Sequence, residues 1–157
     1  MSASFESRDM KCISLWQPWA TLIAIGAKKI ETRGWETKYR GPIAIHAAKL
    51  RTRNLGLLCT TSPFWSALMP VMIEPTRWAY QHRLPFGAVV CTAVLTDCRR
   101  CDPTSIPLDL TELAFGDFTT GRFMWDLDQI TPLKTPVPFK GQQGLFEVPN
   151  ELLKSAT

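Results

Sequence analysis

The stretch that decides the fold is Ser14–Lys49, SLWQPWATLIAIGAKKIETRGWETKYRGPIAIHAAK. It continues from Lys11–Trp16, a short segment that predicts a strand. The following segment, QPWATLIAIG, has Pro18 where a helix begins and Gly26 where one ends. This helix is apolar on nearly every side, so we expect it to be buried rather than to lie on the surface.

Strand patterns continue beyond this helix. Lys29–Arg33 alternates, which places Ile30 and Thr32 on one face and the charged residues on the other. The strands predicted further along the chain are Pro42–Ala47, Gly87–Asp97, Arg122–Ile130 and Gly144–Val148. Gly87–Asp97 is apolar on both faces and rich in valine, which is typical of a central strand. The prolines after Ile130 (Pro132, Pro136 and Pro138) confine that segment to an edge or an extended connection.

Two long segments lack the strand pattern. Arg51–Pro85 is interrupted by three prolines and has Trp65, Trp78 and Tyr80 at loose helical spacing, which predicts two or three short helices inserted between strands. Cys98–Gly116 is rich in proline and aspartate, and we expect it to be mostly loop. About six short strands, one early buried helix and a helical insertion predict an α+β domain organised around a small β-barrel.

Length and composition fit one domain. We expect residues 1–9 to be a polar, disordered lead, residues 10–150 to form a single domain with the helical insertion at 51–85, and residues 151–157 to be a tail. No apolar stretch approaches the roughly 20 residues that a membrane helix needs, so we expect no membrane partner. An odd number of scattered cysteines, five, favours a reducing compartment, and we expect a cytoplasmic location.

The motifs of common cofactor and metal sites are absent from the sequence. It has neither G-x-G-x-x-G nor G-x-x-x-x-G-K-[ST], so a dinucleotide or P-loop function is unsupported and no cofactor is expected. Cys98 and Cys101 form C-x-x-C, but a structural zinc site normally needs four ligands and no second pair is present. We therefore interpret the two thiols as loop residues and expect no metal.

The distribution of charge is more informative than the net charge of +4. Eight basic residues and two acidic ones lie between Lys28 and Arg53, whereas acidic residues outnumber basic ones from Asp97 onward. An anionic partner would bind such a basic region, because phosphate contacts supply most of the sequence-independent affinity for nucleic acid. A solvated charged face is the alternative interpretation.

Aromatic residues are interleaved with these cations, as in proteins that stack on unpaired bases. Tryptophan is mostly buried in proteins, so we expect Trp16 to lie largely in the core. Trp35, in a polar loop, is the better stacking candidate, together with Trp19 or Tyr39. The cations expected to contact phosphates are Lys28, Arg33, Lys38, Arg40 and Lys49.

Lys28, Glu31 and Arg33 form the pattern G-x-K-x-x-E-x-R with Gly26. If they converge, Glu31 can orient Lys28 or accept a proton, and Arg33 can bind a phosphate or a carbonyl oxygen. A salt bridge that locks the turn explains the pattern equally well. His46, with small neighbours on its strand, is either a hydrogen-bonded core residue or part of a pocket floor.

Three motifs together resemble the ASCH family of the PUA-like superfamily: S-L-W-Q-P-W at Ser14–Trp19, G-x-K-x-x-E-x-R at Gly26–Arg33, and R-G-P-x-x-I-H-A-A at Arg40–Ala48. The resemblance implies a PUA-like β-barrel with a cleft beside the early helix. In the family branch that hydrolyses N4-acylated cytidines, a catalytic Lys is followed three residues later by a Thr nucleophile. Here Lys28 matches the lysine but Glu31 stands at the threonine position, so the sequence is nearer the transcription-coactivator-type branch.

The resulting hypothesis is a binding module whose basic cleft holds RNA, another single-stranded nucleic acid or a modified nucleotide. The site residues that we expect are Trp16, Gln17, Trp19, Lys28, Glu31, Arg33, Trp35, Lys38, Tyr39, Arg40, His46 and Lys49. The alternative is a hydrolase of RNA or of a modified nucleoside such as N4-acylcytidine, with Lys28 and Glu31 as catalytic residues. A third interpretation is a protein partner that docks on the helical insertion, around Trp65, Trp78 and Tyr80.

Overall fold

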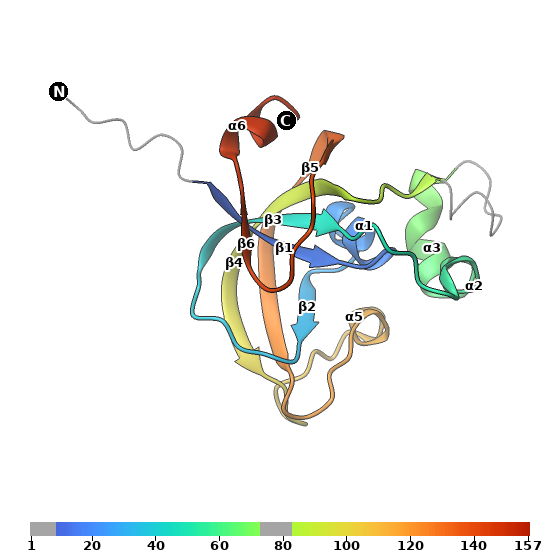
Figure 1. Ribbon diagram of the computed structural model, residues 1–157. Helices are drawn as coiled ribbons and strands as arrows, with labels where there is room; N and C mark the ends of the chain where they lie inside the picture. The colour runs from blue at the N-terminus through green and yellow to red at the C-terminus, as the bar shows by residue number, and fades with distance from the viewer. Residues whose placement is uncertain (1–8, 73–82) are drawn as a thin grey trace.

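A computed structural model describes residues 9–72 and 83–157. Its strands are β1 (Met10–Leu15), β2 (Ile30–Arg33), β3 (Gly41–Ala47), β4 (Ala88–Arg100), β5 (Phe123–Pro138) and β6 (Phe146–Val148). They form one mixed sheet in the order β2-β5-β4-β3-β1-β6 (Figure 1). β1 and β3 are parallel, and the other neighbouring strands are antiparallel. The α+β class predicted from the sequence is confirmed.

The closed barrel that we predicted is not formed. The two edge strands, β2 and β6, are not paired with each other among the described residues, so the sheet stays open between them. Both are short, with four and three residues respectively, while β4 and β5 extend over 13 and 16 residues. Register shifts interrupt the β3–β4 and β4–β5 pairings, and such irregularities increase the bend and twist of a sheet. The sheet therefore coils around a core without closing.

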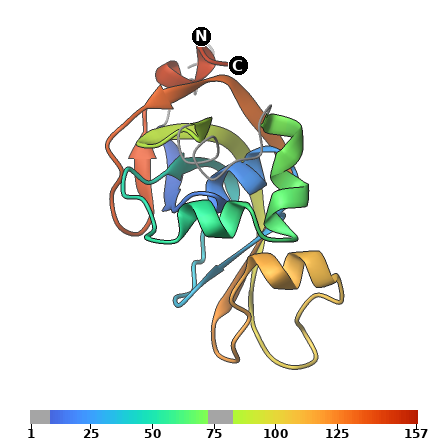
Figure 2. The same cartoon turned by 90° about the vertical axis from the view of Figure 1, so that its right-hand side faces the viewer.

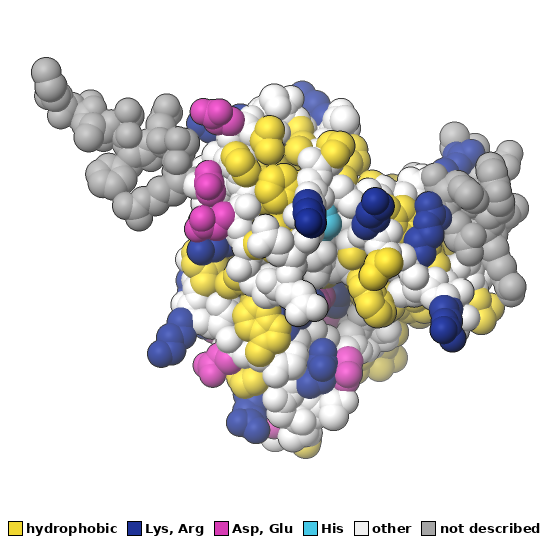
Figure 3. All heavy atoms as spheres, viewed as in Figure 1, with side chains coloured by type: hydrophobic (Ala, Val, Ile, Leu, Met, Phe, Trp, Pro, Cys, Tyr) yellow, Lys and Arg dark blue, Asp and Glu magenta, His cyan; other side chains and the backbone are white. Residues whose placement is uncertain are grey.

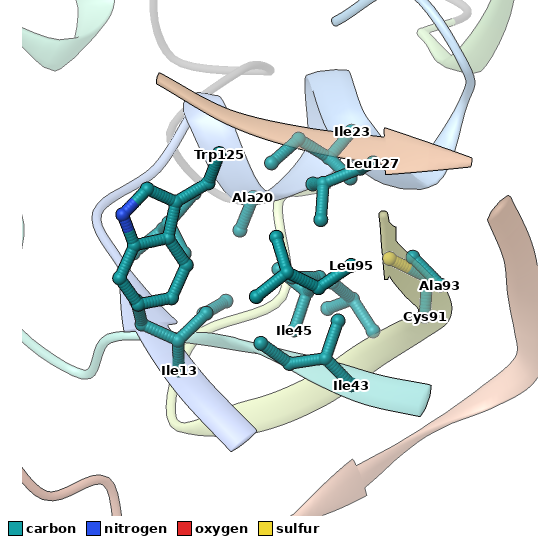
Figure 4. Close-up of a cluster of buried hydrophobic side chains, with 13 residues drawn as sticks. Ile13, Ala20, Ile23, Ile43, Ile45, Cys91, Ala93, Leu95, Trp125 and Leu127 are labelled. Carbon is teal, nitrogen blue, oxygen red and sulfur yellow. The ribbon is translucent and has the colours of Figure 1, made fainter. Parts of the chain in front are cut away.

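The early helix is α1 (Trp19–Ala24), and it is buried as expected. Its Ala20 and Ile23 join Ile13, Ile45, Trp125 and other strand side chains in one apolar cluster, where Figure 4 shows them pointing into a shared interior. On its other side, Leu22 packs in a second cluster with residues of the helical segments. α1 thus lies between the coiled sheet and the helical segments of this second cluster. Gly26 follows its end at φ +78°, a conformation that favours glycine.

Short helices occupy the described part of the predicted insertion. They are α2 (Leu55–Cys59), α3 (Phe64–Leu68) and the 3₁₀ turn η1 (Met69–Val71), which lie together at one side of the sheet (Figures 1 and 2). Phe64 and Leu68 are buried, while Leu57 and Trp65 are partly exposed. Trp78 and Tyr80 lie outside the described residues, so the apolar patch predicted around these aromatic residues stays a prediction.

The segment predicted as loop between Cys98 and Gly116 contains regular structure at both ends. β4 continues to Arg100, and α5 (Leu110–Phe115) follows. α5 begins at Asp109, whose side chain accepts a hydrogen bond from the backbone N–H of Glu112. This D-x-x-E spacing is an N-capping pattern. The helix was not predicted because the proline and aspartate content of the segment indicated a loop.

The segment after Ile130 belongs to β5 rather than to a connection. Pro132 and Pro138 are opposite Cys91 and Ala88 of β4. β2 pairs with β5 only along Phe123–Asp126, so among the described residues the proline-containing part of β5 is a local edge, where a missing N–H is tolerated.

Residues near the C-terminus pack on the sheet. They include α6 (Asn150–Lys154), and Leu153 and Ala156 are buried in a third apolar cluster with Cys12 and Val148. The region 151–157, expected to be a tail, therefore contains most of α6 and packs on the sheet through Leu153 and Ala156. Within the described part of the chain, no helix has the length and apolar character needed to cross a membrane.

Candidate nucleic-acid interface

A cleft of about 1120 Å³ lies at the ends of β1 and β3. Its walls come from the β1–α1 turn, from β2 and the loop after it, from the residues after β3, and from the loop between β5 and β6. The residues that line it are Ser14, Leu15, Trp16, Trp19, Glu31, Arg33, Trp35, His46, Ala48, Lys49, Leu50, Phe86, Gly87, Phe139, Lys140, Gly141, Gln142, Gln143 and Gly144.

The parallel pairing of β1 and β3 sets Ser14 opposite His46 at the base of this cleft. The Phe139 carbonyl oxygen lies 2.8 Å from His46 Nε2, and Ser14 Oγ lies 2.9 Å from Nδ1. A carbonyl oxygen can only accept, so Nε2 carries a proton and donates it, and in the neutral ring Nδ1 accepts from the serine hydroxyl. Burial lowers the pKa of His46, and the Phe139 hydrogen bond partly opposes this effect. His46 is therefore a neutral ring that ties the β5–β6 loop to the sheet.

Gly141 allows that loop to lie directly on the histidine. A Cβ at this position would be 2.6 Å from His46 Cε1 and 3.2 Å from Ser14 Oγ. Both distances are shorter than ordinary van der Waals contact, so a side chain here would push the loop away. Glycine is thus required for the close approach that forms one wall of the cleft.

Glu31 and Arg33 project together from β2 into the cleft, because alternate residues of a strand share a face. Arg33 Nη1 lies 3.4 Å from Glu31 Oε1 and 3.4 Å from the Ser14 main-chain oxygen. Only 12% of the Glu31 side chain is exposed. Burial raises the pKa of Glu31, against the opposing effects of Lys28, Arg33 and Arg122. Glu31 also lines a second hollow of about 310 Å³ beside α5.

Lys28 lies behind this pair and does not line the cleft. Its side chain is 1% exposed, and Nζ donates to the Ile30 carbonyl oxygen and lies 4.0 Å from Glu112 Oε1. Glu112 accepts hydrogen bonds from the Lys29 and Ile30 backbone N–H groups at 3.1 and 2.9 Å. Burial lowers the pKa of Lys28, although Glu31 and Glu112 oppose this effect. Lys28 therefore stabilises the turn that leads into β2, through its contacts with the Ile30 carbonyl oxygen and Glu112.

The rim of the cleft carries exposed cations and one exposed aromatic ring. Lys49, after β3, and Lys140, in the β5–β6 loop, are both exposed, and Trp16 is 56% exposed. Figure 3 shows Lys and Arg side chains on both sides of the histidine on this face of the molecule. The mouth is thus positively charged above a floor that contains a carboxylate.

The expectation that Trp16 lies in the core is wrong, and Trp35 has packing partners that the sequence did not indicate. Trp16, expected in the core, is exposed because it follows the last residue of β1 and lies outside α1. Trp35, expected as the stacking residue, packs edge-on against Trp125 with ring centroids 4.7 Å apart. The Arg33 guanidinium lies 5.9 Å from the Trp35 ring centroid, so this ring also supports the arginine. The polarity of the neighbouring residues in the sequence predicted neither the exposure of Trp16 nor the packing of Trp35 against Trp125.

The structure brings together seven of the predicted site residues in the cleft lining: Trp16, Trp19, Glu31, Arg33, Trp35, His46 and Lys49. Five lie elsewhere: Gln17, Lys28, Lys38, Tyr39 and Arg40. Gln17 is buried and bonds the Pro85 carbonyl oxygen and the Thr21 N–H. Arg40 pairs with Asp97 at 3.3 Å. Lys38, Tyr39 and Arg40 lie in the loop between β2 and β3, outside the cleft lining.

Sequence reasoning missed the cleft residues contributed by the β5–β6 loop and by β1. The main ones are Ser14, Lys140, Gly141, Gln142 and Gln143. The K-G-Q-Q-G spacing at Lys140–Gly144 was a usable signal, since two glycines flanking polar residues mark a loop that approaches other backbone closely. Its position beside the Ser14–Lys49 stretch depends on the long-range pairing of β6 with β1.

The cysteines are free thiols, and four of the five are buried. Across residues 9–72 and 83–157 no group of three or more His, Cys, Asp or Glu side chains is arranged to hold a metal ion.

Residues 13–108 match the family model described as the ASCH domain, and the chain therefore belongs to the ASCH domain family. A segment of 40 residues is 45% identical to mouse (Mus musculus) activating signal cointegrator 1. That segment is 26% of this chain and 7% of the length of the relative.

Solved structures share the fold. The ASCH protein of Zymomonas mobilis is similar with a TM-score of 0.52 and 17% identity, over 93% of this chain and 92% of that chain. A point mutant of the same protein matches with a TM-score of 0.51 and 17% identity, over 94% and 96% of the two chains. At this identity the likeness shows the fold alone.

Proposed function

We propose that this ASCH domain binds single-stranded nucleic acid, RNA in the first place, or a modified nucleotide, in the cleft at the ends of β1 and β3. The observation that carries the proposal is the combination of an exposed aromatic ring, Trp16, with exposed cations, Lys49 and Lys140, around one concave site. Stacking on a ring and charge along a groove are the two interactions that hold unpaired strands.

The cleft also has a size that suits a nucleotide. Its volume of about 1120 Å³ is slightly above the usual range of sites that hold small ligands, about 300–1,000 Å³. Arg33 adds a third cation inside the cleft, anchored by the Ser14 main-chain oxygen. A strand can therefore contact the rim with its phosphates while one base enters the cleft.

We further infer that the chain is nearer the transcription-coactivator-type branch of the family than the amidohydrolase branch. The 45% identity over 40 residues to activating signal cointegrator 1 supports this inference. Glu31 in place of a threonine, beside a lysine that is buried, also supports it.

The test is a titration of labelled single-stranded RNA at several salt concentrations. The variant Lys49→Ala/Lys140→Ala removes two cleft cations, and we expect it to weaken binding and to reduce the slope of log K against log salt by about 1.4, at about 0.7 per lost phosphate contact. The control Lys134→Ala/Lys154→Ala removes the same charge from exposed positions outside the cleft lining. Equal losses in the two variants would mean that only net charge matters and would reject the cleft.

A hydrolase of RNA or of a modified nucleoside is the second candidate, and one observation favours it. Glu31 is a cleft carboxylate whose pKa is raised by burial, which suits a general base. Lys28 does not line the cleft, so its part would be to position Glu31. Chromatography of RNA and of N4-acetylcytidine after incubation separates the two candidates: released product that disappears in Glu31→Gln would identify an enzyme.

A further inference from the structure

Glu31 is a buried carboxylate with unused hydrogen-bonding capacity on the cleft side. A carboxylate has about four lone-pair positions. Among the described residues, the side chain that donates to it is Arg33, through Nη1 at 3.4 Å from Oε1, which is a long hydrogen bond. The side chain as a whole is 12% exposed, and Glu31 is part of the cleft lining. The lone pairs that Arg33 leaves unused can therefore accept hydrogen bonds from a ligand in the cleft.

Arg33 gives the adjacent position the opposite polarity. Its guanidinium is held by the Ser14 main-chain oxygen and the Trp35 ring, and its side chain is 25% exposed. An arginine only donates hydrogen bonds. A ligand entering the cleft therefore meets two carboxylate oxygens that accept, followed by a guanidinium that donates.

Among the RNA bases, guanine matches this order of groups. Its Watson–Crick edge presents two neighbouring donors, N1–H and the 2-amino group, followed by the O6 acceptor. Cytosine and adenine offer the carboxylate one amino group beside an acceptor. Uracil has a single N–H between two carbonyl oxygens, so one carboxylate oxygen would face a carbonyl oxygen and be repelled.

We propose that the Glu31–Arg33 pair selects guanine at the base-binding position of the cleft, with Glu31 accepting from N1–H and the 2-amino group and Arg33 donating to O6. The inference rests on the proposed function, because it assigns a base to the nucleic acid held there. Burial raises the pKa of Glu31, and the cations Lys28 and Arg33 oppose this effect. Two donors from the ligand would favour the ionised carboxylate that this contact needs.

The experiment compares pentauridylates whose central base is uracil, guanine, hypoxanthine or 1-methylguanine. Hypoxanthine differs from guanine only by the missing 2-amino group, and 1-methylguanine lacks N1–H. We expect the guanine strand to bind about 10- to 100-fold more tightly than each of the others, the usual effect of one hydrogen bond to a charged group. These comparisons use the unaltered protein, so they do not depend on the folding of a variant.

The variant Glu31→Gln tests the residue assignment. Glutamine replaces one acceptor oxygen with an amide NH₂, so one of the two guanine donors would face a donor, and the guanine strand should lose its advantage over the hypoxanthine strand. The matched control is Glu147→Gln, which removes a carboxylate that pairs with Lys11 outside the cleft lining, and it should keep the full preference.

The outcomes separate this inference from the proposed function. Equal binding of all four strands to the unaltered protein, with the salt dependence described above, would overturn guanine selection and leave nucleic-acid binding in place. A guanine preference that persists in Glu31→Gln would overturn the role of Glu31. A complete lack of binding to every strand would reject the proposed function itself, and the inference with it.

Discussion

At the scale of single residues, Gly141 allows the β5–β6 loop to lie against His46 and so form one wall of the cleft. We expect Gly141→Ala to lower the free energy of unfolding by about 1–3 kcal/mol, because the added methyl group would stand 2.6 Å from His46 Cε1 and would overpack the site. Gly34→Ala is the control, since its Cβ meets Arg122 Nη1 at an ordinary 3.8 Å. Denaturant unfolding of both variants measures the difference. Equal losses would show that the loop accommodates a side chain without strain.

Glu31 predicts a dependence of stability on pH. Its folded pKa is raised above the ordinary value of 4.5, so the folded state binds more protons than the unfolded state between these two values. The contribution of Glu31 to stability is therefore greatest at low pH and falls as the pH rises from 4.5 through the raised pKa.

Glu31→Gln removes this titration. The melting temperature of the variant minus that of the parent should accordingly be larger at about pH 8 than at roughly pH 4, below the ordinary glutamate pKa. Thermal melts at both pH values measure the difference. A difference that stays constant or declines with pH would contradict the raised pKa.

At the scale of elements, α5 supports the turn that leads into β2. Glu112 accepts from two backbone N–H groups and lies 4.0 Å from Lys28 Nζ. We expect Glu112→Ala to lower the free energy of unfolding by about 1.5–3 kcal/mol, the range for hydrogen bonds to a charged group. Glu151→Ala, at an exposed position of α6, is the control. A loss no larger than that of the control would mean that α5 does not support the turn.

The elements that the sequence predicts well are those whose pattern is local. The α1 helix and the strands β1 to β4 were predicted within a few residues, because their signals are local. Pro18 and Gly26 mark the ends of the helix, and runs of alternating or continuous apolar residues mark the strands. The length of β5 was not predicted, because three prolines suggested that the strand stops early. They are tolerated because this part of β5 pairs with β4 and, among the described residues, has no β2 partner on its other side. The α5 helix was missed because the proline and aspartate content of its segment indicated a loop. Its contacts with Lys28 and with the N–H groups of Lys29 and Ile30 connect residues more than 80 positions apart.

At the scale of the whole molecule, the same distinction applies to the site. The cleft residues from Ser14–Lys49 were predicted where the strand face determines them, as for Glu31, Arg33 and His46. Lys28 was misplaced because burial and a partner on α5 decide its direction. Lys140 and its loop were missed because they reach the cleft through pairing between β6 and β1 at opposite ends of the chain.

The central claim is that the cleft, rather than another surface, holds the nucleic acid. The most direct measurement is nuclear magnetic resonance of ¹⁵N-labelled protein titrated with single-stranded RNA. The account predicts that the indole N–H signals of Trp16 and Trp19 and the backbone signals of residues 140–144 shift together, while the indole signal of Trp65 on α3 stays in place. Shifts confined to Trp65 and its neighbours on α2 and α3, with the cleft signals unchanged, would contradict it.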